Sequence, residues 1–160
     1  MTLATTTTAA PSGSVSVSGA DIARVARDYL GARWTHQGRA ENGLDCAGLI
    51  VKVAKELGLS DFDKTDYART ATDETMLSIC REHLVEVARS DLQEGDIVVM
   101  RFGANRHIGI VGLYPYGGHT VIHAQTMHPR MVVENQLSDS WLSMVSASIA
   151  GCFRFPRLTA

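Results

Sequence analysis

The 160-residue sequence predicts an α+β fold, in which N-terminal helices pack on an antiparallel β-sheet of about five strands. Three observations lead to this prediction. Apolar residues recur at helical spacing in the first half of the chain, and β-branched residues form short runs in the second half. The turns between these runs are too short for the crossovers that parallel strands need. The chain length suits one domain with one core.

Three helices are expected in the first half. The first follows an N-cap at Ser18, with an acidic residue three positions later, and ends at Gly31. The second spans residues 47–57 and is apolar on most faces, so it is expected to be the buried central helix. The third spans residues 74–83, and a short strand follows it at 84–88.

The strands of the second half are separated by turn residues such as Gly103-Ala104-Asn105 and Tyr116-Gly117-Gly118. Their expected positions are residues 96–102, 107–114, 120–124, 131–134 and 149–155.

The expected domain organisation is an arm followed by one domain. Residues 1–18 are rich in Thr and Ser and contain few large apolar groups, which indicates an arm that is flexible or bound to a partner. Residues 19–160 form the single folded domain. The arm lacks a basic start and an apolar run, so we expect no secretory signal peptide.

The composition excludes several classes of function. The net charge is -2, and the 15 Lys and Arg residues are scattered rather than clustered. We therefore expect neither nucleic acid nor a membrane surface as a partner. Three cysteines are an odd number without paired spacing, so we expect no disulfide framework and no tetrahedral zinc site. No other metal and no cofactor are expected. Cys80 and Cys152 stand among apolar neighbours and are interpreted as packing residues.

The strongest sign of chemistry is the segment 43–50. Asp45 is expected to cap the second helix, which places Cys46 in its first turn. Free backbone N–H groups and the positive end of the helix dipole stabilise a thiolate there, so we expect a lowered pKa for Cys46. The alternative is a small buried cysteine that only packs at the start of a core helix.

A cysteine nucleophile needs a base within hydrogen-bond distance, and histidine titrates in the required range. His107 begins an apolar strand directly after a turn, so its ring can project from the sheet end toward the helix. His123 stands on the expected neighbouring strand and can orient His107 through a hydrogen bond. Taken singly, each histidine is more simply explained as a surface or hydrogen-bonded residue.

Four blocks together resemble the NlpC superfamily of cell-wall peptidases and stand in that family's order. They are LDCAGLI (44–50), EGDIV (94–98), HIGI (107–110) and IHA (122–124). The resemblance extends from about residue 20 to residue 156. It implies a papain-like core and a cysteine peptidase with Cys46, His107 and His123 as catalytic residues.

The resemblance also implies a substrate and a reaction. The substrate is the stem peptide of bacterial peptidoglycan, cut between D-glutamate and a diamino acid. One departure concerns the oxyanion site, where the family often has a tyrosine and this sequence has Trp34. Either the Trp34 N–H or His36 then supplies the missing donor, or the enzyme is slow. Asp45 is assigned to the same substrate and oxyanion region.

The loop at 33–39 and the ending IAGCFRFP (149–156) are similar to the branch found in tailed phages and gene transfer agents. In that branch the peptidase is part of the tail tip or baseplate. The resemblance implies synthesis in the bacterial cytoplasm, delivery by a particle to the periplasmic cell wall, and docking on a tail or baseplate protein, with the arm 1–18 as a candidate anchor.

Two other functions stay open at this point. One is an amidase that cuts between the lactyl group of the sugar and L-alanine. The other is a structural tail module with weak or no activity, which the Trp34 departure favours and the set of Cys46, His107 and His123 opposes. The sequence does not specify the diamino acid, the docking partner, the copy number or a means of restraining activity before delivery.

Overall fold

The structure is a computed structural model that describes residues 16–156. Residues 1–15 and 157–160 lie outside the described part, and so does most of the predicted arm. Val17 packs against the core and Ser18 caps the first helix, so the last residues of that arm belong to the domain. Within residues 16–156, no helix is long and apolar enough to cross a membrane.

The predicted helices are present, and one more follows. The Ser18 hydroxyl accepts a hydrogen bond from the Asp21 N–H, and the Asp21 carboxylate accepts one from the Ser18 N–H. The last helix was not predicted, because it is short and its main signal is a single capping serine, Ser138. The helices are α1 (Gly19–Asp28), α2 (Cys46–Glu56), α3 (Thr75–His83), the 3-10 helix η1 (Arg89–Asp91) and α4 (Asp139–Met144).

The main sheet has six strands in the order β4-β9-β5-β6-β7-β8, and every neighbouring pair is antiparallel. The predicted α+β class and the antiparallel sheet are confirmed. The sixth strand is the short segment after α3, which pairs with the last strand. The strands are β4 (Val85–Val87), β5 (Ile97–Phe102), β6 (Asn105–Leu113), β7 (His119–Ala124), β8 (Val132–Leu137) and β9 (Ala147–Arg154).

A second, small sheet occupies the segment that we predicted to be a loop. It consists of β1 (Arg33–Trp34), β2 (Arg39–Ala40) and β3 (Gly43–Leu44), in the order β1-β3-β2. Strands of two residues are too short to show a period of two in the sequence. The Trp34 N–H donates to the Arg130 carbonyl at 2.9 Å, which fixes this sheet to the chain before β8.

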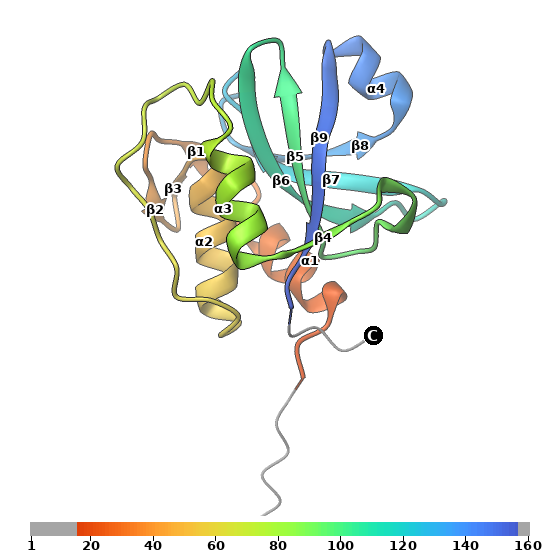
Figure 1. Cartoon of the computed structure of the whole chain (residues 1–160), viewed down its shortest axis with the longest axis horizontal. Helices are drawn as coiled ribbons and strands as arrows, with labels where there is room; N and C mark the ends of the chain where they lie inside the picture. Colours follow the sequence, from red (N-terminus) through yellow and green to blue (C-terminus); the bar gives the residue numbers. More distant parts are fainter. Residues whose placement is uncertain (1–15, 157–160) are drawn as a thin grey trace, which may run out of the picture.

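Both faces of the main sheet are covered. Helices α1, α2 and α3 lie to one side of it, and α4 lies on the other side near β8 and β9 (Figure 1). Leu49 and Val53 of α2 pack with Ile110 in the larger apolar cluster, whereas Leu142 of α4 packs with Val111 in the smaller one. The predicted burial of the second helix is therefore confirmed. Its start is held at the end of the sheet where β6 begins.

Candidate active site

The nucleophile candidate is the first residue of α2. Asp45 caps this helix, and its carboxylate accepts a hydrogen bond from the Gly48 N–H at 2.7 Å, as the sequence predicts. A side chain at Gly48 would meet the Gly38 carbonyl oxygen at 2.1 Å, so the small sheet lies directly on the first turn of the helix. Cys46 is thus fixed from both sides of the helix start.

Burial raises the pKa of the Cys46 thiol to about 11, and the negative charge of Asp45 adds to this effect. The backbone N–H groups of Ile108, Ala47 and Cys46 itself act in the opposite direction, because they favour the thiolate. The prediction of a lowered pKa was therefore wrong for the free protein, since loss of solvent outweighs the helix N-terminus. The N–H of Ile108 places the thiol against the residue that follows His107.

The histidines form a hydrogen-bonded chain across three neighbouring strands. Nε2 of His107 lies 2.7 Å from Nδ1 of His123, and Nε2 of His123 lies 2.7 Å from Oδ1 of Asn135. The amide oxygen only accepts, so His123 carries its proton on Nε2. His123 then accepts at Nδ1 from the Nε2–H of His107. The chain therefore leaves Nδ1 of His107 as a free base.

Burial keeps this pair of rings neutral. It lowers the pKa of His107 to about 3, with a further contribution from the positive charge that His123 would carry, and it also lowers the pKa of His123. The hydrogen bond to Asn135 acts in the opposite direction on His123. The Phe102 ring packs edge-on to His107 at 5.5 Å, and the Trp141 ring packs on His123 at 5.9 Å between centroids.

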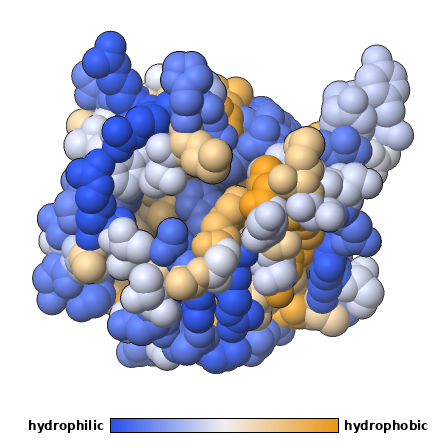
Figure 2. Space-filling view, turned by 90° about the horizontal axis from the view of Figure 1, so that it is seen from above, coloured by the Kyte–Doolittle hydropathy of each residue, from blue (hydrophilic) through white to orange (hydrophobic). Residues whose placement is uncertain are grey.

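Cys46, His107 and His123 line one cleft with a volume of about 910 Å³. Its walls are the ends of β6, β7 and β8 on one side, and α2, α3 and the loop at 57–74 on the other. Seen from above, apolar surface forms a band through the middle of this face, with hydrophilic residues on both sides (Figure 2). In the described chain, no hydrogen bond joins the Cys46 thiol to either histidine. Such contacts are often long before substrate binds.

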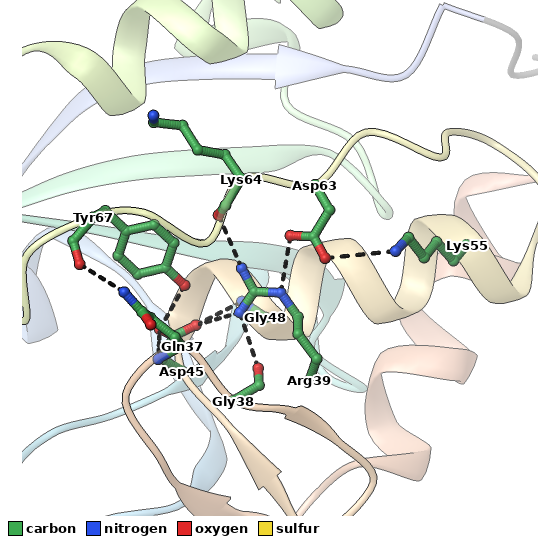
Figure 3. A network of polar contacts seen from close by, with 9 residues as sticks. All are labelled: Gln37, Gly38, Arg39, Asp45, Gly48, Lys55, Asp63, Lys64 and Tyr67. Carbon is green, nitrogen blue, oxygen red and sulfur yellow. Dashed lines mark hydrogen bonds and ion pairs between the residues drawn. The ribbon is translucent and has the colours of Figure 1, made fainter.

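Asp45 ties three segments together. Besides Gly48, its carboxylate accepts from the Gln37 N–H at 2.7 Å and from the Tyr67 hydroxyl at 2.7 Å, and it pairs with Arg39 at 3.3 Å (Figure 3). Asp45 is only 3% exposed. The observed role of Asp45 is to cap and anchor, and its assignment to the substrate site stays a prediction.

Arg39 extends this network into the loop at 57–74. Its guanidinium donates to the Asp63 carboxylate at 3.0 Å and to the Lys64 carbonyl at 3.2 Å (Figure 3). The loop therefore reaches the helix start through polar contacts, whereas its first residues, Leu57 and Leu59, pack against the apolar core.

Trp34 and His36 differ in position. Trp34 lines both the cleft and a second pocket beside it, whereas His36 lines only the second pocket, and the two ring centroids lie 6.4 Å apart. The contribution of either residue to the oxyanion site stays a prediction. Cys80 and Cys152 are buried among apolar residues and are free thiols. Among residues 16–156, no group of three or more His, Cys, Asp and Glu side chains is placed to hold a metal ion.

The sequence analysis missed Asn135, Tyr67 and Arg39. Asn135 stands in β8 after a run of mainly apolar residues, and it pairs with Val121, two residues before His123 on the neighbouring strand, so the alternation of side chains places both on one face. Tyr67 and Arg39 lie in irregular or very short elements, whose contacts no spacing rule reveals.

A family model described as the NlpC/P60 family matches residues 31–148. The chain belongs to the NlpC/P60 family. The matched region contains the helix start, both histidines and Asn135. It excludes α1 and most of β9, which complete the domain.

Curated relatives in the NlpC/P60 family come from two bacteria. The chain is 28% identical over 100 residues to the murein DD-endopeptidase MepS/murein LD-carboxypeptidase of Escherichia coli K12, covering 62% of this chain and 45% of that protein. It is 36% identical over 117 residues to a probable endopeptidase of Corynebacterium glutamicum, covering 72% of this chain and 46% of that protein. The chain thus spans less than half the length of these relatives.

Solved structures of NlpC/P60 proteins share the fold. A family protein from Bacillus cereus superposes with a TM-score of 0.61 at 19% identity, covering 88% of this chain and 41% of that one. The NlpC/P60 domain of the peptidoglycan hydrolase SagA superposes with a TM-score of 0.55 at 18% identity, covering 86% of this chain and 99% of that one. The expected papain-like fold is confirmed by these neighbours.

Proposed function

We propose that this chain is a cysteine endopeptidase that hydrolyses the stem peptides of bacterial peptidoglycan, with Cys46 as nucleophile and His107 as general base. The observation that carries the proposal is the hydrogen-bonded chain of His107, His123 and Asn135 on the wall of the cleft that Cys46 also lines. This chain fixes the proton on the far side of His107 and leaves its Nδ1 free to take one from a thiol.

The first half of the reaction forms a thioester. Nδ1 of His107 removes the proton from the Cys46 thiol as the sulfur attacks the carbonyl carbon of the scissile amide. The N–H groups of Cys46 and Ala47 stabilise the oxyanion, because the next N–H, that of Gly48, is already bound to Asp45. The imidazolium then protonates the leaving nitrogen, the C–N bond breaks and the amine departs.

The second half of the reaction hydrolyses the thioester. Nδ1 of His107 takes a proton from water, the hydroxide adds to the thioester carbonyl, and the C–S bond breaks. The product acid leaves, and the proton returns from His107 to Cys46. Because burial disfavours both charged forms, the neutral pair is the resting state, and proton transfer accompanies the attack of the sulfur.

The bond that is cut needs its own test. The E. coli relative is named for a DD-endopeptidase and an LD-carboxypeptidase activity. For this chain we propose the bond between D-glutamate and the diamino acid, on the basis of the four sequence blocks. Each of these cleavages releases a fragment of different mass, as does an amidase cut before L-alanine.

The test is mass spectrometry of soluble fragments after purified peptidoglycan is incubated with the wild type or with Cys46→Ala. We expect fragments that end at D-glutamate from the wild type and none from the variant. Fragments cut before L-alanine would show that the activity is that of an amidase and not of an endopeptidase. If a folded wild type and the variant both release nothing, also when the chain is assembled in its particle, the protein is not a peptidase.

We also propose that a phage or phage-like particle delivers the enzyme to the periplasmic wall, as part of its tail tip or baseplate and docked through residues 1–18. The support is the resemblance of residues 33–39 and 149–156 to that branch. Peptide mass spectrometry of purified particles is expected to detect the chain, and its absence from them would overturn this proposal. The presence of Trp34 at the tyrosine position favours a structural tail role as the second candidate, which inactive but particle-bound protein would support.

A further inference from the structure

Three arginines gather around Trp34 at one end of the cleft. Arg33 belongs to β1, Arg69 to the loop at 57–74, and Arg130 to the segment before β8, so three separate parts of the chain meet here. They line a pocket of about 580 Å³, and none of the residues lining it is acidic. Trp34, Arg69 and Arg130 also line the cleft that Cys46 lines, so the pocket is continuous with that cleft.

The indole, rather than a carboxylate, holds two of these cations. The guanidinium carbon of Arg69 lies 4.8 Å and that of Arg130 lies 5.3 Å from the centre of the Trp34 ring. Within residues 16–156, the side chains of Arg33, Arg69 and Arg130 form no ion pair and no hydrogen bond. Other arginines of the chain are paired with acids, for example Arg27 with Glu134. The cation–π contacts hold Arg69 and Arg130 near the indole and leave their N–H donors free for a ligand.

The backbone fixes this arrangement before a ligand arrives. The Trp34 N–H bonds to the Arg130 carbonyl, and Arg33 forms an antiparallel bridge with Met131. The pocket is therefore built from a strand and its partner segment rather than from isolated surface side chains. A guanidinium presents paired N–H donors that match the two oxygens of a carboxylate.

We propose that this arginine pocket is a carboxylate-binding subsite, which holds the stem peptide by one of its free carboxyl groups while the neighbouring amide lies at Cys46. The inference rests on the proposed function for the identity of the substrate, and on the pocket itself for the chemistry. A γ-linked D-glutamate keeps its α-carboxyl group free, and the last residue of the stem carries another. Both are anions within a short reach of the scissile bond.

The kinetic test uses synthetic stem peptides in which each free carboxyl group in turn is replaced by a carboxamide. We expect the wild type to cleave one of the amidated peptides about 10–100-fold less efficiently than the free acid, mainly through KM, because charge-assisted hydrogen bonds are lost. The double variant R69Q/R130Q is expected to lose this preference, so that it cleaves the free acid as slowly as the wild type cleaves the sensitive amidated peptide.

The matched control is R24Q/R81Q, which removes the same charge from exposed arginines of α1 and α3. This control is expected to keep the wild-type preference for the free-acid peptide. All measurements are made at the same ionic strength. Equal cleavage of all peptides by the wild type, or equal losses in both double variants, would overturn the subsite.

A binding measurement separates the subsite from the reaction. Cys46→Ala protein is titrated with the same peptides while NMR follows the indole N–H signal of Trp34, assigned with Trp34→Phe. We expect the free-acid peptide to shift this signal, and R69Q/R130Q in the Cys46→Ala background to abolish the shift. If this signal shifts but protein with an intact Cys46 cleaves no peptide, the subsite stands and the peptidase function is refuted. If the peptides are cleaved equally with and without the free carboxyl group, the peptidase function stands and the subsite is refuted. A shift with inorganic phosphate but not with the peptides would assign the pocket to a phosphorylated ligand instead.

Discussion

The sheet wall and the loop wall of the cleft face the same space but are held by different forces. The sheet wall, formed by β6, β7 and β8, carries His107, His123 and Asn135 on paired strands whose other residues are largely in the core. The loop wall, residues 57–74, is mostly exposed and reaches the helix start through Tyr67 and the contacts of Arg39. The groups proposed for the chemistry thus lie on paired strands, whereas the loop beyond Leu59 is held by a few polar contacts, such as the hydrogen bond from Tyr67 to Asp45. Changes on the sheet wall should therefore lower kcat, and changes on the loop wall should mainly raise KM.

The largest effect is expected from His107→Gln. Removing the general base should lower kcat/KM by about 10³-fold, since general base catalysis contributes about 10²–10⁴-fold. His119→Gln is the matched control, because His119 begins β7 away from the cleft lining. Hydrolysis of a soluble stem peptide measures both. Loss below 10-fold in His107→Gln would mean that another group accepts the thiol proton.

The next effect concerns the far end of the histidine chain. Asn135→Ala should lower kcat by about 10–100-fold with little change in KM, because His123 and then His107 lose the partner that fixes their protonation. Asn135→Asp should recover part of the rate and raise the lower pKa of the kcat profile, since a carboxylate stabilises protonated His123. Gln136→Ala, on the solvent side of the same strand, is the control. If Asn135→Ala keeps the wild-type pH profile, Asn135 only packs against His123 and does not set its protonation.

A third prediction tests the burial of His107 on the sheet wall through the pH dependence of the free energy of unfolding. The folded-state pKa of His107 is lowered, so the stability that its neutral form provides is complete above its unfolded pKa of about 6.5 and is lost as pH falls toward about 3. In that window the free energy of unfolding should fall by up to about 1.4 kcal/mol per pH unit from this one group. Urea unfolding at pH 7.5 and pH 5 measures it. His107→Gln should show a shallower decline, and an unchanged slope would mean that His107 is solvated.

The smallest effect is expected on the loop wall. Tyr67→Phe removes the hydroxyl that donates to Asp45 and should cost about 1 kcal/mol of unfolding free energy, with a several-fold rise in KM and nearly constant kcat. Tyr116→Phe, at a residue 89% exposed, is the control and should change neither quantity. A large fall in kcat in Tyr67→Phe would contradict the separation of the two walls, because it would place the loop in the chemical step.

The same difference explains what the sequence could predict. Cys46 and the two histidines lie on regular elements, so capping and strand order offered them as candidates, and the resemblance of the four sequence blocks selected them as one set. The pKa of Cys46 did not follow, because its burial depends on how the helix start meets the sheet. Asn135 required knowledge of the register between β7 and β8, because its contact with His123 is diagonal, two residues from the paired position. The contacts of Arg39 and Tyr67 depend on an irregular loop, whose path no periodicity encodes.

The carboxylate of Asp45 limits how freely this protein can be re-engineered. It receives donors from the nucleophile helix, the small sheet and the loop at once. A chimera that imports residues 57–74 from another NlpC/P60 protein would also need a hydroxyl at position 67 and an acid at position 63, or the helix start would lose its outer support. Exchange of this loop therefore also affects the stability of the helix start, so libraries that vary the loop should keep those two positions constant.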